Sequence, residues 1–400
     1  MLPAAHHTTR WIADLGLPPL PREELERCSE LSQQIRQQIT AAGGQISFCH
    51  YMEQALYAPT LGYYTGGKQK LGNSGDFITA PELSPLFGRC LARPCAEALT
   101  ASGGDTILEF GAGSGRLAVD LLRELEQLGQ LPKNYWILDI SPDLRQLQRQ
   151  TIARELPAWQ SRIRWLDHLP AKLNGVILAN EVVDAMPVHR FRIHQGSSQE
   201  AFIGWESRPD GGAFTLHWQP SALTPEIEAL GLELADGYSS ERNLLADAWI
   251  HELATHLQRG LILLIDYGYT RSEYYHPERS SGTLLCHFRH HAHPDPLLLP
   301  GLQDITAHVD FTALANSAHA AGLEVAGYTT QGNFLLNCGL DQLLHPLLQG
   351  SSDTLLEPIQ QVKRLTLPTQ MGERFKVLAL SRGLAHPPSG FQRHDQRHRL

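Results

Sequence analysis

The chain has 400 residues, a formal net charge of −9 and a hydrophobic content of 42%. A chain of this length is too long to form a single small hydrophobic core, so one large α/β domain with insertions, or two lobes, is expected. The sequence contains no basic block and no apolar run of transmembrane length, which argues against a nucleic-acid partner and against a membrane span. Its six cysteines form no C-x-x-C pair, which favours reduced thiols over disulfides or a zinc site. The N-terminus also lacks the apolar core of a signal peptide, so we expect a cytoplasmic bacterial protein.

Helical patterns dominate the first hundred residues. Apolar side chains recur at helical spacing over 23–42, and Gly43-Gly44 ends that pattern. Ser47 is a candidate N-cap for a second helix through Tyr57. We therefore predict an N-terminal helical lobe over residues 1–100.

Strand and helix patterns alternate from residue 101, which is typical of a doubly wound parallel sheet. An insertion at about 190–222 alternates like a small antiparallel sheet, and a second at about 332–371 has mostly helical character. We predict an α/β fold with a seven-stranded, mostly parallel Rossmann-like sheet over 101–385 and a disordered polar tail over 386–400. The expected strands of this sheet are 106–110, 135–140, 163–166, 175–179, 261–266, 323–330 and 375–381.

A glycine-rich loop separates the first of these strands from the helix predicted over 116–128. Glu109 lies near the end of this strand, and glycines follow at 111, 113 and 115. Dinucleotide-binding loops have the spacing G-x-G-x-x-G, and here the third glycine comes one residue early. The spacing E-x-G-x-G-x-G resembles motif I of class I S-adenosylmethionine (SAM) methyltransferases. Because SAM carries cationic groups instead of phosphates, it favours a nearby carboxylate such as Glu109.

Two further expectations follow from the carboxyl ends of the strands, where ligands bind in open α/β sheets. Asp139, near the end of the second strand, is expected to hydrogen-bond ribose hydroxyls. The fourth strand ends in NEVVDAMP, which brings Asn180, Glu181 and Asp184 to the same edge. Paired carboxylates can orient an arginine guanidinium and counter its charge. The structural alternative is that Asp184 caps a turn and Glu181 pairs with Arg190.

Other polar segments carry weaker signals. The run Asp266–Gly268 is expected at the same sheet edge, and 304–311 is expected to form a further polar loop. Both would line a cleft. The histidine-rich run CHFRHHAH at 286–293 lacks the regular spacing of a metal site and fits a loop over a substrate cleft better.

Several blocks together resemble the MidA-type SAM-dependent methyltransferases: GDFITAPE at 75–82, LEFGAGSG at 108–115, NEVVDAMPVHRF at 180–191 and DITAHVDF at 304–311. This family includes a mitochondrial complex I assembly factor that methylates arginine. The resemblance implies SAM as cofactor and a protein arginine as acceptor. It implies catalytic positions at Glu181 and Asp184, and cofactor contacts at Glu109, Gly111, Gly113, Gly115, Asp139, Asp167, Asn180, Gly75, Asp76, Phe77 and Thr79.

Three alternatives stay open at this point. The acceptor could be a small molecule, with the N-terminal lobe and the insertion closing over it. The chain could instead be a SAM-binding assembly factor without turnover. A nicotinamide enzyme is disfavoured by the glycine spacing. A protein substrate is expected as partner, and a homodimer is one open arrangement.

Overall fold

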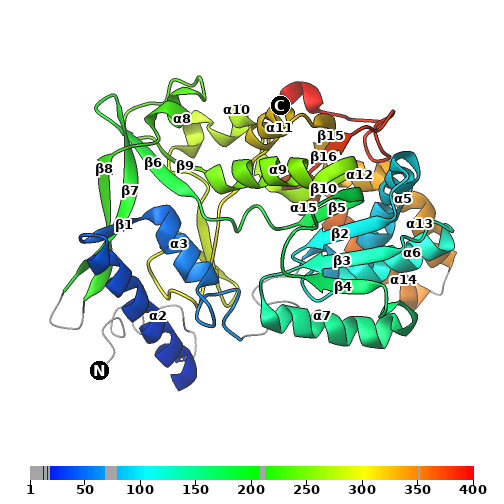
Figure 1. Cartoon of the computed structure of the whole chain (residues 1–400), viewed down its shortest axis with the longest axis horizontal. Helices are drawn as coiled ribbons and strands as arrows, with labels where there is room; N and C mark the ends of the chain where they lie inside the picture. Colours follow the sequence, from blue (N-terminus) through cyan, green and yellow to red (C-terminus); the bar gives the residue numbers. More distant parts are fainter. Residues whose placement is uncertain (1–11, 13–15, 17–18, 68–78, 208–211, 350–351) are drawn as a thin grey trace. The chain divides into compact units, whose positions relative to one another are not determined.

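The computed structural model describes residues 12, 16, 19–67, 79–207, 212–349 and 352–400 (Figure 1). Contacts divide the chain into two compact units, which we describe separately. The sheet unit comprises 69–184, 246–271 and 309–400, and the N-terminal unit comprises 1–68, 185–245 and 272–308. The N-terminal helices therefore share a unit with the β insertion. The predicted boundary at residue 100 stays a prediction.

The sheet unit is built on one large, mostly parallel sheet, which confirms the predicted α/β class. Within the described residues the strand path is β15-β16-β10-β5-β2-β3-β4, and β14 pairs with β10 as an eighth strand. Only β16 on this path runs antiparallel to its neighbours. Figure 1 shows β5, β2, β3 and β4 side by side in this order. The strands are β2 (Thr106–Phe110), β3 (Asn134–Leu138), β4 (Ile163–Leu166), β5 (Leu173–Asn180), β10 (Leu257–Tyr269), β14 (Val309–Asp310), β15 (Glu324–Thr330) and β16 (Phe375–Arg382).

Apolar runs form the centre of this sheet because helices cover both of its faces. Every residue of β2 is buried, and Val176 of β5 and Leu263 of β10 have no exposed surface. Helix α5 packs against β5 and β10 and contacts α6, α12 and α13. The helices of this unit are α4 (Ala80–Leu83), α5 (Pro85–Ser102), α6 (Arg116–Gln127), α7 (Pro142–Glu155), α9 (Leu244–His256), α11 (Phe311–Ala320), α12 (Gln331–Asn337), α13 (Leu340–Leu344), α14 (Ser352–Thr366) and α15 (Met371–Arg374), with short 3-10 turns η1 (Pro157–Trp159), η3 (His345–Gln349) and η4 (Arg397–Arg399).

The N-terminal unit contains an antiparallel sheet with path β1-β7-β6-β9, to which β8 adds by pairing with β7. A three-stranded sheet β12-β11-β13 belongs to the same unit. Ser47 caps α3 as predicted, because its hydroxyl accepts a hydrogen bond from the His50 amide at 3.2 Å. The elements are α2 (Arg22–Ala41), β1 (Gln45–Ser47), α3 (Phe48–Tyr57), β6 (His189–His194), β7 (Ser197–Glu206), β8 (Ala213–Pro220), α8 (Thr224–Glu228), β9 (Ser239–Arg242), α10 (Arg271–Tyr274), η2 (Pro277–Arg279), β11 (Leu285–Phe288), β12 (His291–His293) and β13 (Asp304–Thr306). Among the residues that the structure describes, no helix is both long and apolar enough to cross a membrane.

The predicted disorder of the C-terminal tail is wrong. Phe391 is only 4% exposed, and its ring lies 5.4 Å from that of Phe334 in α12, measured between centroids. Ser389 donates its backbone N–H to Glu97 of α5 at 2.7 Å. Gly327 of β15 leaves room for the Phe391 ring, since a Cβ there would lie 2.3 Å from it. A buried aromatic ring and hydrogen bonds to α5 therefore order a segment whose composition is otherwise polar.

Replacing Phe391 by alanine should lower the free energy of unfolding by about 3 kcal/mol, as expected for removal of a buried phenylalanine. Chemical denaturation monitored by circular dichroism measures this loss. His398→Ala, in the same tail but exposed, is the matched control and should change stability little. Equal stabilities of the two variants would contradict the anchoring role.

Candidate active site

The carboxyl ends of the parallel strands bring most of the predicted site residues into one row. Phe110 of β2 pairs with Leu138 of β3 and with Ala179 of β5, and Leu138 pairs with Leu166 of β4. The residues that follow these positions therefore lie at one edge of the sheet, where open α/β sheets bind ligands. They are Gly111, Asp139, Asp167 and Asn180.

The glycine loop at this edge adopts a backbone that side chains disfavour. Gly111, Gly113 and Gly115 have φ of 59°, 54° and 84°. A Cβ on Gly115 would lie 3.3 Å from the Gln148 Cα, and a Cβ on Gly111 would lie 3.2 Å from a methyl group of Val182. The glycines thus allow both the left-handed turns and the close approach of neighbouring chain.

Gln148 of α7 ties this loop to the next two strands, and no sequence pattern singled it out. Its side-chain amide donates to the Gly113 carbonyl at 3.1 Å and to the Asp139 carboxylate at 2.7 Å. Its carbonyl accepts from the Trp165 indole at 2.8 Å. Because Gln148 is fully buried, these three bonds fix the loop relative to Asp139.

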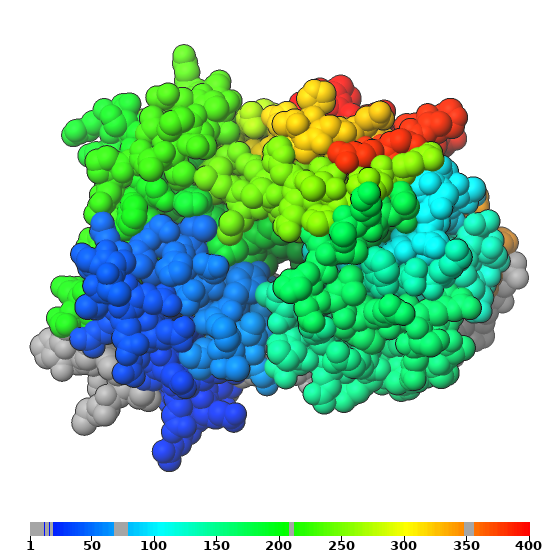
Figure 2. All heavy atoms as spheres, in the orientation of Figure 1, coloured from blue at the N-terminus to red at the C-terminus, as the bar shows by residue number. Residues whose placement is uncertain are grey.

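The three acids at the ends of β2, β3 and β4 lie in different surroundings. Glu109 is buried and accepts a hydrogen bond from the Tyr135 hydroxyl at 2.7 Å. Burial raises the pKa of Glu109 to about 7, while the Tyr135 bond opposes this rise. Asp139 is buried and also accepts from the Ser141 amide at 2.9 Å. Asp167 is exposed, and its hydrogen bond with Arg145 of α7 lowers its pKa. Figure 2 shows α7 at the surface of the sheet unit.

Three carboxylates meet where β5 ends and its pairing with β10 stops: Glu181, Asp184 and Asp266. Asp266 accepts hydrogen bonds from the backbone amides of Val182, Val183 and Asp184 at 3.0–3.3 Å. Asp184 accepts a hydrogen bond from the Tyr267 hydroxyl.

Glu181 is half-buried, at φ 55°, and accepts from the Asn180 side-chain amide at 3.0 Å. The structure thus brings both predicted acids together with Asp266, which the sequence placed only at the same edge.

Burial and mutual repulsion govern the charges of this cluster. Burial, with the charge of Asp184, raises the pKa of Glu181 to about 8. Burial, with the charges of Asp184 and Glu181, raises the pKa of Asp266 well above its usual value. Arg190, the structural partner considered for Glu181, lies 4.0 Å from Glu241 in the N-terminal unit. Carboxylates held this close gain stability from a bound cation, which replaces their lost hydration.

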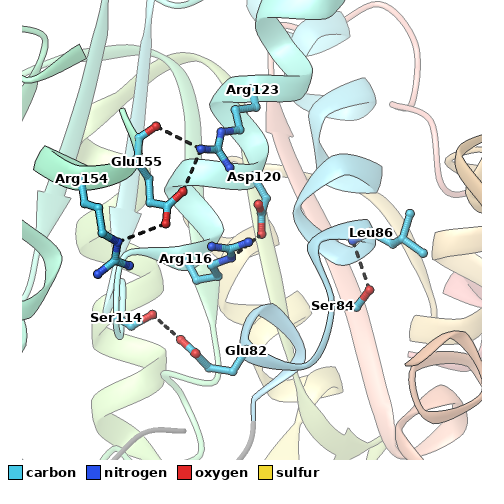
Figure 3. A network of polar contacts seen from close by, with 9 residues as sticks. All are labelled: Glu82, Ser84, Leu86, Ser114, Arg116, Asp120, Arg123, Arg154 and Glu155. Atoms are coloured by element: carbon cyan, nitrogen blue, oxygen red, sulfur yellow. Dashed lines mark hydrogen bonds and ion pairs between the residues drawn. The ribbon is translucent and has the colours of Figure 1, made fainter. Parts of the chain in front are cut away.

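The block GDFITAPE is described in part. Gly75, Asp76 and Phe77 lie outside the described residues, and Thr79 is the N-cap residue of α4. Glu82, in α4, accepts a hydrogen bond from the Ser114 hydroxyl in the glycine loop (Figure 3). The only feature of the sequence that pointed to Glu82 was its position in the GDFITAPE block.

Other polar pairs lie beside the Glu82 contact. Figure 3 shows Arg116 pairing with Asp120 along α6, and Arg123 joining Glu155 of α7. The first pair lies within α6, and the second joins α6 to α7, which pack against each other.

The histidine-rich run forms the hairpin of β11 and β12 in the N-terminal unit. Arg289 and His290 turn the chain with φ of 47° and 66°. Burial lowers the pKa of His293. Asp304, from the predicted polar loop, accepts a hydrogen bond from the Tyr64 hydroxyl at 3.0 Å in the same unit. That these segments line a substrate cleft stays a prediction.

Comparison with known proteins identifies the family. Residues 90–329 match the model of the family described as "Putative S-adenosyl-L-methionine-dependent methyltransferase". The chain belongs to this family. The match covers the glycine loop and the carboxylate cluster, so this methyltransferase uses SAM as its cofactor, as the sequence predicted.

Similar proteins support the same assignment. The chain is 43% identical to a Burkholderia thailandensis protein whose crystal structure contains bound S-adenosyl-homocysteine, with a TM-score of 0.92 and coverage of 96% of this chain and 100% of that one. It is 31% identical to the human mitochondrial protein arginine methyltransferase NDUFAF7, over 84% of this chain and 80% of the relative. The zebrafish (Danio rerio) protein of the same name is 30% identical, over 85% and 84%.

The expectation of a bacterial cytoplasmic location is contradicted by the curated arginine methyltransferase relatives, which are named as mitochondrial proteins. All six cysteines lie in the described residues and are free.

Replacing Gln148 by methionine should lower the free energy of unfolding by roughly 2 kcal/mol and weaken SAM binding. The methionine side chain removes the hydrogen bonds that Gln148 donates to the Asp139 carboxylate and to the Gly113 carbonyl. Thermal unfolding with and without SAM measures both effects. Gln146→Met, the same change at an exposed position of α7, is the control and should leave both quantities near wild type. Matching values for the two variants would rule out this role of Gln148.

Proposed function

We propose that this methyltransferase transfers the methyl group of SAM to an arginine side chain of a protein. The observation that carries the proposal is the cluster of Glu181, Asp184 and Asp266 at the sheet edge, next to the glycine loop. An arginine guanidinium stays positively charged at physiological pH and presents N–H groups that match carboxylates in pairs. The names of the curated relatives support the same acceptor.

The residues at the sheet edge fit the cofactor. The left-handed glycines leave the loop backbone open to a ligand, and Asn180 keeps a buried side-chain oxygen without a hydrogen-bond partner among the described residues. Bound SAM supplies an electrophilic methyl group on a sulfonium. We assign its binding to Glu109, Gly111, Gly113, Gly115, Asp139, Asp167, Asn180 and Thr79, with Gly75, Asp76 and Phe77 in the undescribed part of the same block.

The three carboxylates have different proposed roles in binding the acceptor. Asp266 is occupied by the backbone amides that follow β5, so its role is to hold the Glu181–Asp184 loop. Tyr267 holds Asp184. This leaves Glu181 and Asp184 to clamp the guanidinium and to aim one nitrogen at the methyl group.

Glu181 is also suited to take up a proton. When the nitrogen gains the methyl group it must lose one proton, and an acid whose pKa is about 8 holds that proton well near neutral pH. The cation brought by the substrate favours the ionised form of Glu181 before transfer, so the carboxylate is ready to accept it.

A pair of matched peptides tests the acceptor. The full chain is incubated with SAM and an arginine-containing peptide, or with the same peptide carrying lysine in place of arginine. Mass spectrometry should find methyl groups on arginine only. Methylation of the lysine peptide alone would contradict the proposal. SAM binding without turnover on a panel of arginine peptides and arginine-containing respiratory subunits would favour an assembly role.

A further inference from the structure

The glycine loop touches the segment that follows β5 through the side chain of Val182. Apart from its chain neighbours, the only described atom within 4 Å of a Cβ placed on Gly111 is a methyl carbon of Val182, at 3.2 Å. Val182 therefore packs directly on the Cα of Gly111. The segment that carries the proposed acceptor acids and the loop that holds the cofactor meet at this point.

Main-chain bonds fix Gly111 on its side of the contact. It directly follows β2, and its backbone N–H donates to the Leu138 carbonyl of β3 at 3.1 Å. Because the neighbouring strands hold it in this way, Gly111 cannot shift freely when its surroundings press on it.

Main-chain bonds also fix Val182 on the other side. Its N–H and that of Val183 donate to the Asp266 carboxylate at 3.2 and 3.0 Å. The preceding amide, that of Glu181, donates to the Ile265 carbonyl of β10 at 2.9 Å. Valine is branched at Cβ, so its side chain has few alternative rotamers with which to avoid a neighbour. A displacement of Val182 would therefore move the backbone of Glu181 with it.

The side chain of Glu181 is held within the same segment. Its φ is 55°, and its carboxylate accepts a hydrogen bond from the Asn180 side-chain amide at 3.0 Å. Both features are local, so they orient the carboxylate within the segment but do not set its distance from the glycine loop. The contact of Val182 with Gly111 joins the segment to the loop and can set that distance.

We propose that Val182 is a positioning residue for methyl transfer: it rests on Gly111 and thereby sets the distance of Glu181 from the cofactor loop. The inference rests on the proposed function, in which Glu181 aims the guanidinium nitrogen at the methyl group of SAM. The attacking nitrogen must lie close to the methyl carbon and in line with the C–S bond that breaks, so small errors in this distance slow the reaction. The first glycine of the loop is then required by the acceptor side of the site as well as by the cofactor.

Two substitutions that compensate each other test this role in the full chain. Gly111→Ala presses a methyl group against Val182, and Val182→Ala leaves a gap, so each alone should lower the rate of methyl transfer about tenfold. In the double variant the methyl group added at 111 fills the gap left at 182, and the rate should return to within about threefold of wild type. Single-turnover methylation of the arginine peptide at saturating SAM gives these rates.

The affinity for SAM separates this role from a general disturbance of the cofactor loop. Gly111→Ala should weaken SAM binding about tenfold, because an alanine at φ 59° is strained. Adding Val182→Ala leaves this strain in place, so it should restore the rate of transfer but not the SAM affinity. Calorimetry with SAM measures the affinity of each variant.

Gly129→Ala is the matched control, since it adds a methyl group at another positive φ, 66°, where nothing lies within 4 Å of it. Combined with Val182→Ala, it should not restore the rate. If Gly111→Ala does not fold, Val182→Ala still decides, because a wild-type rate in that variant would exclude the role.

Two results would overturn the proposal: a double variant no faster than its single variants, or one whose SAM affinity recovers together with its rate. A wild type that transfers no methyl group to arginine would instead refute the proposed function on which this inference rests.

Discussion

Substituting alanine for Gly115 should weaken SAM binding by about 100-fold. The backbone there has φ 84°, which costs an alanine about 1–2 kcal/mol. Its Cβ would also press against the Gln148 Cα at 3.3 Å, so the loop and α7 must separate. A combined cost of about 3 kcal/mol corresponds to two orders of magnitude in affinity. Isothermal titration calorimetry with SAM, below the unfolding temperature, measures the change.

Gly129→Ala is the matched control for this experiment. Gly129 also has a positive φ, 66°, but nothing lies within 4 Å of a Cβ placed there. The control should lose about 1 kcal/mol of stability while keeping its SAM affinity. If both variants bind SAM equally well, the glycine loop does not hold the cofactor as proposed.

Replacing Glu181 by glutamine should lower kcat by about 100-fold or more, while the affinity for SAM changes little. Glutamine keeps the size of the side chain but neither clamps the guanidinium as an anion nor accepts its proton, and a lost general base typically costs this much. Single-turnover methylation of the arginine peptide gives the rate, and calorimetry gives the SAM affinity. Glu126→Gln, an exposed glutamate of α6, is the control. A Glu181 variant with wild-type turnover would contradict the clamp.

The raised pKa of Glu181 makes two pH effects measurable. The kcat/KM of the wild type should rise with pH through about 8, because the ionised carboxylate is the competent form. The free energy of unfolding should change with pH in the opposite direction. The folded state holds this proton more tightly than the unfolded chain, so stability falls as pH rises from about 4.5 to about 8. Glu181→Gln removes this contribution, and its stability relative to wild type should increase over that range.

The sequence predicted the central strands well because they are short apolar runs buried on both faces. Both ends of β2 and of β4 coincide with the predicted ranges. Strand β10 is longer than its apolar run, at Leu257–Tyr269, because main-chain pairing with β5, β16 and β14 continues beyond it. Such pairing depends on partners far along the chain and leaves no local signature. The same holds for the tail, where the Phe391 ring and the Ser389 amide contact helices far away in the sequence.

In the site, too, some features have a local sequence signal and others depend on residues far apart in the chain. Glycine spacing and the paired acids follow from local chemistry, and the structure gathers them at one edge. Gln148 could not be predicted, because a glutamine on a helix gives no sign that it will be buried between two strands. The bond between Glu109 and Tyr135 likewise depends on two strands meeting in register.

The backbone of Glu181 has a consequence for how this protein can change. At φ 55° the backbone conformation costs a glutamate about 1–2 kcal/mol more than it costs a glycine. A glycine at this position would also remove one acid from the cluster of Glu181, Asp184 and Asp266. Glu181→Gly should therefore be more heat-resistant than the natural chain and inactive. Selection for thermal robustness alone would erase the proposed proton acceptor, so its presence at this position points to continued selection for turnover.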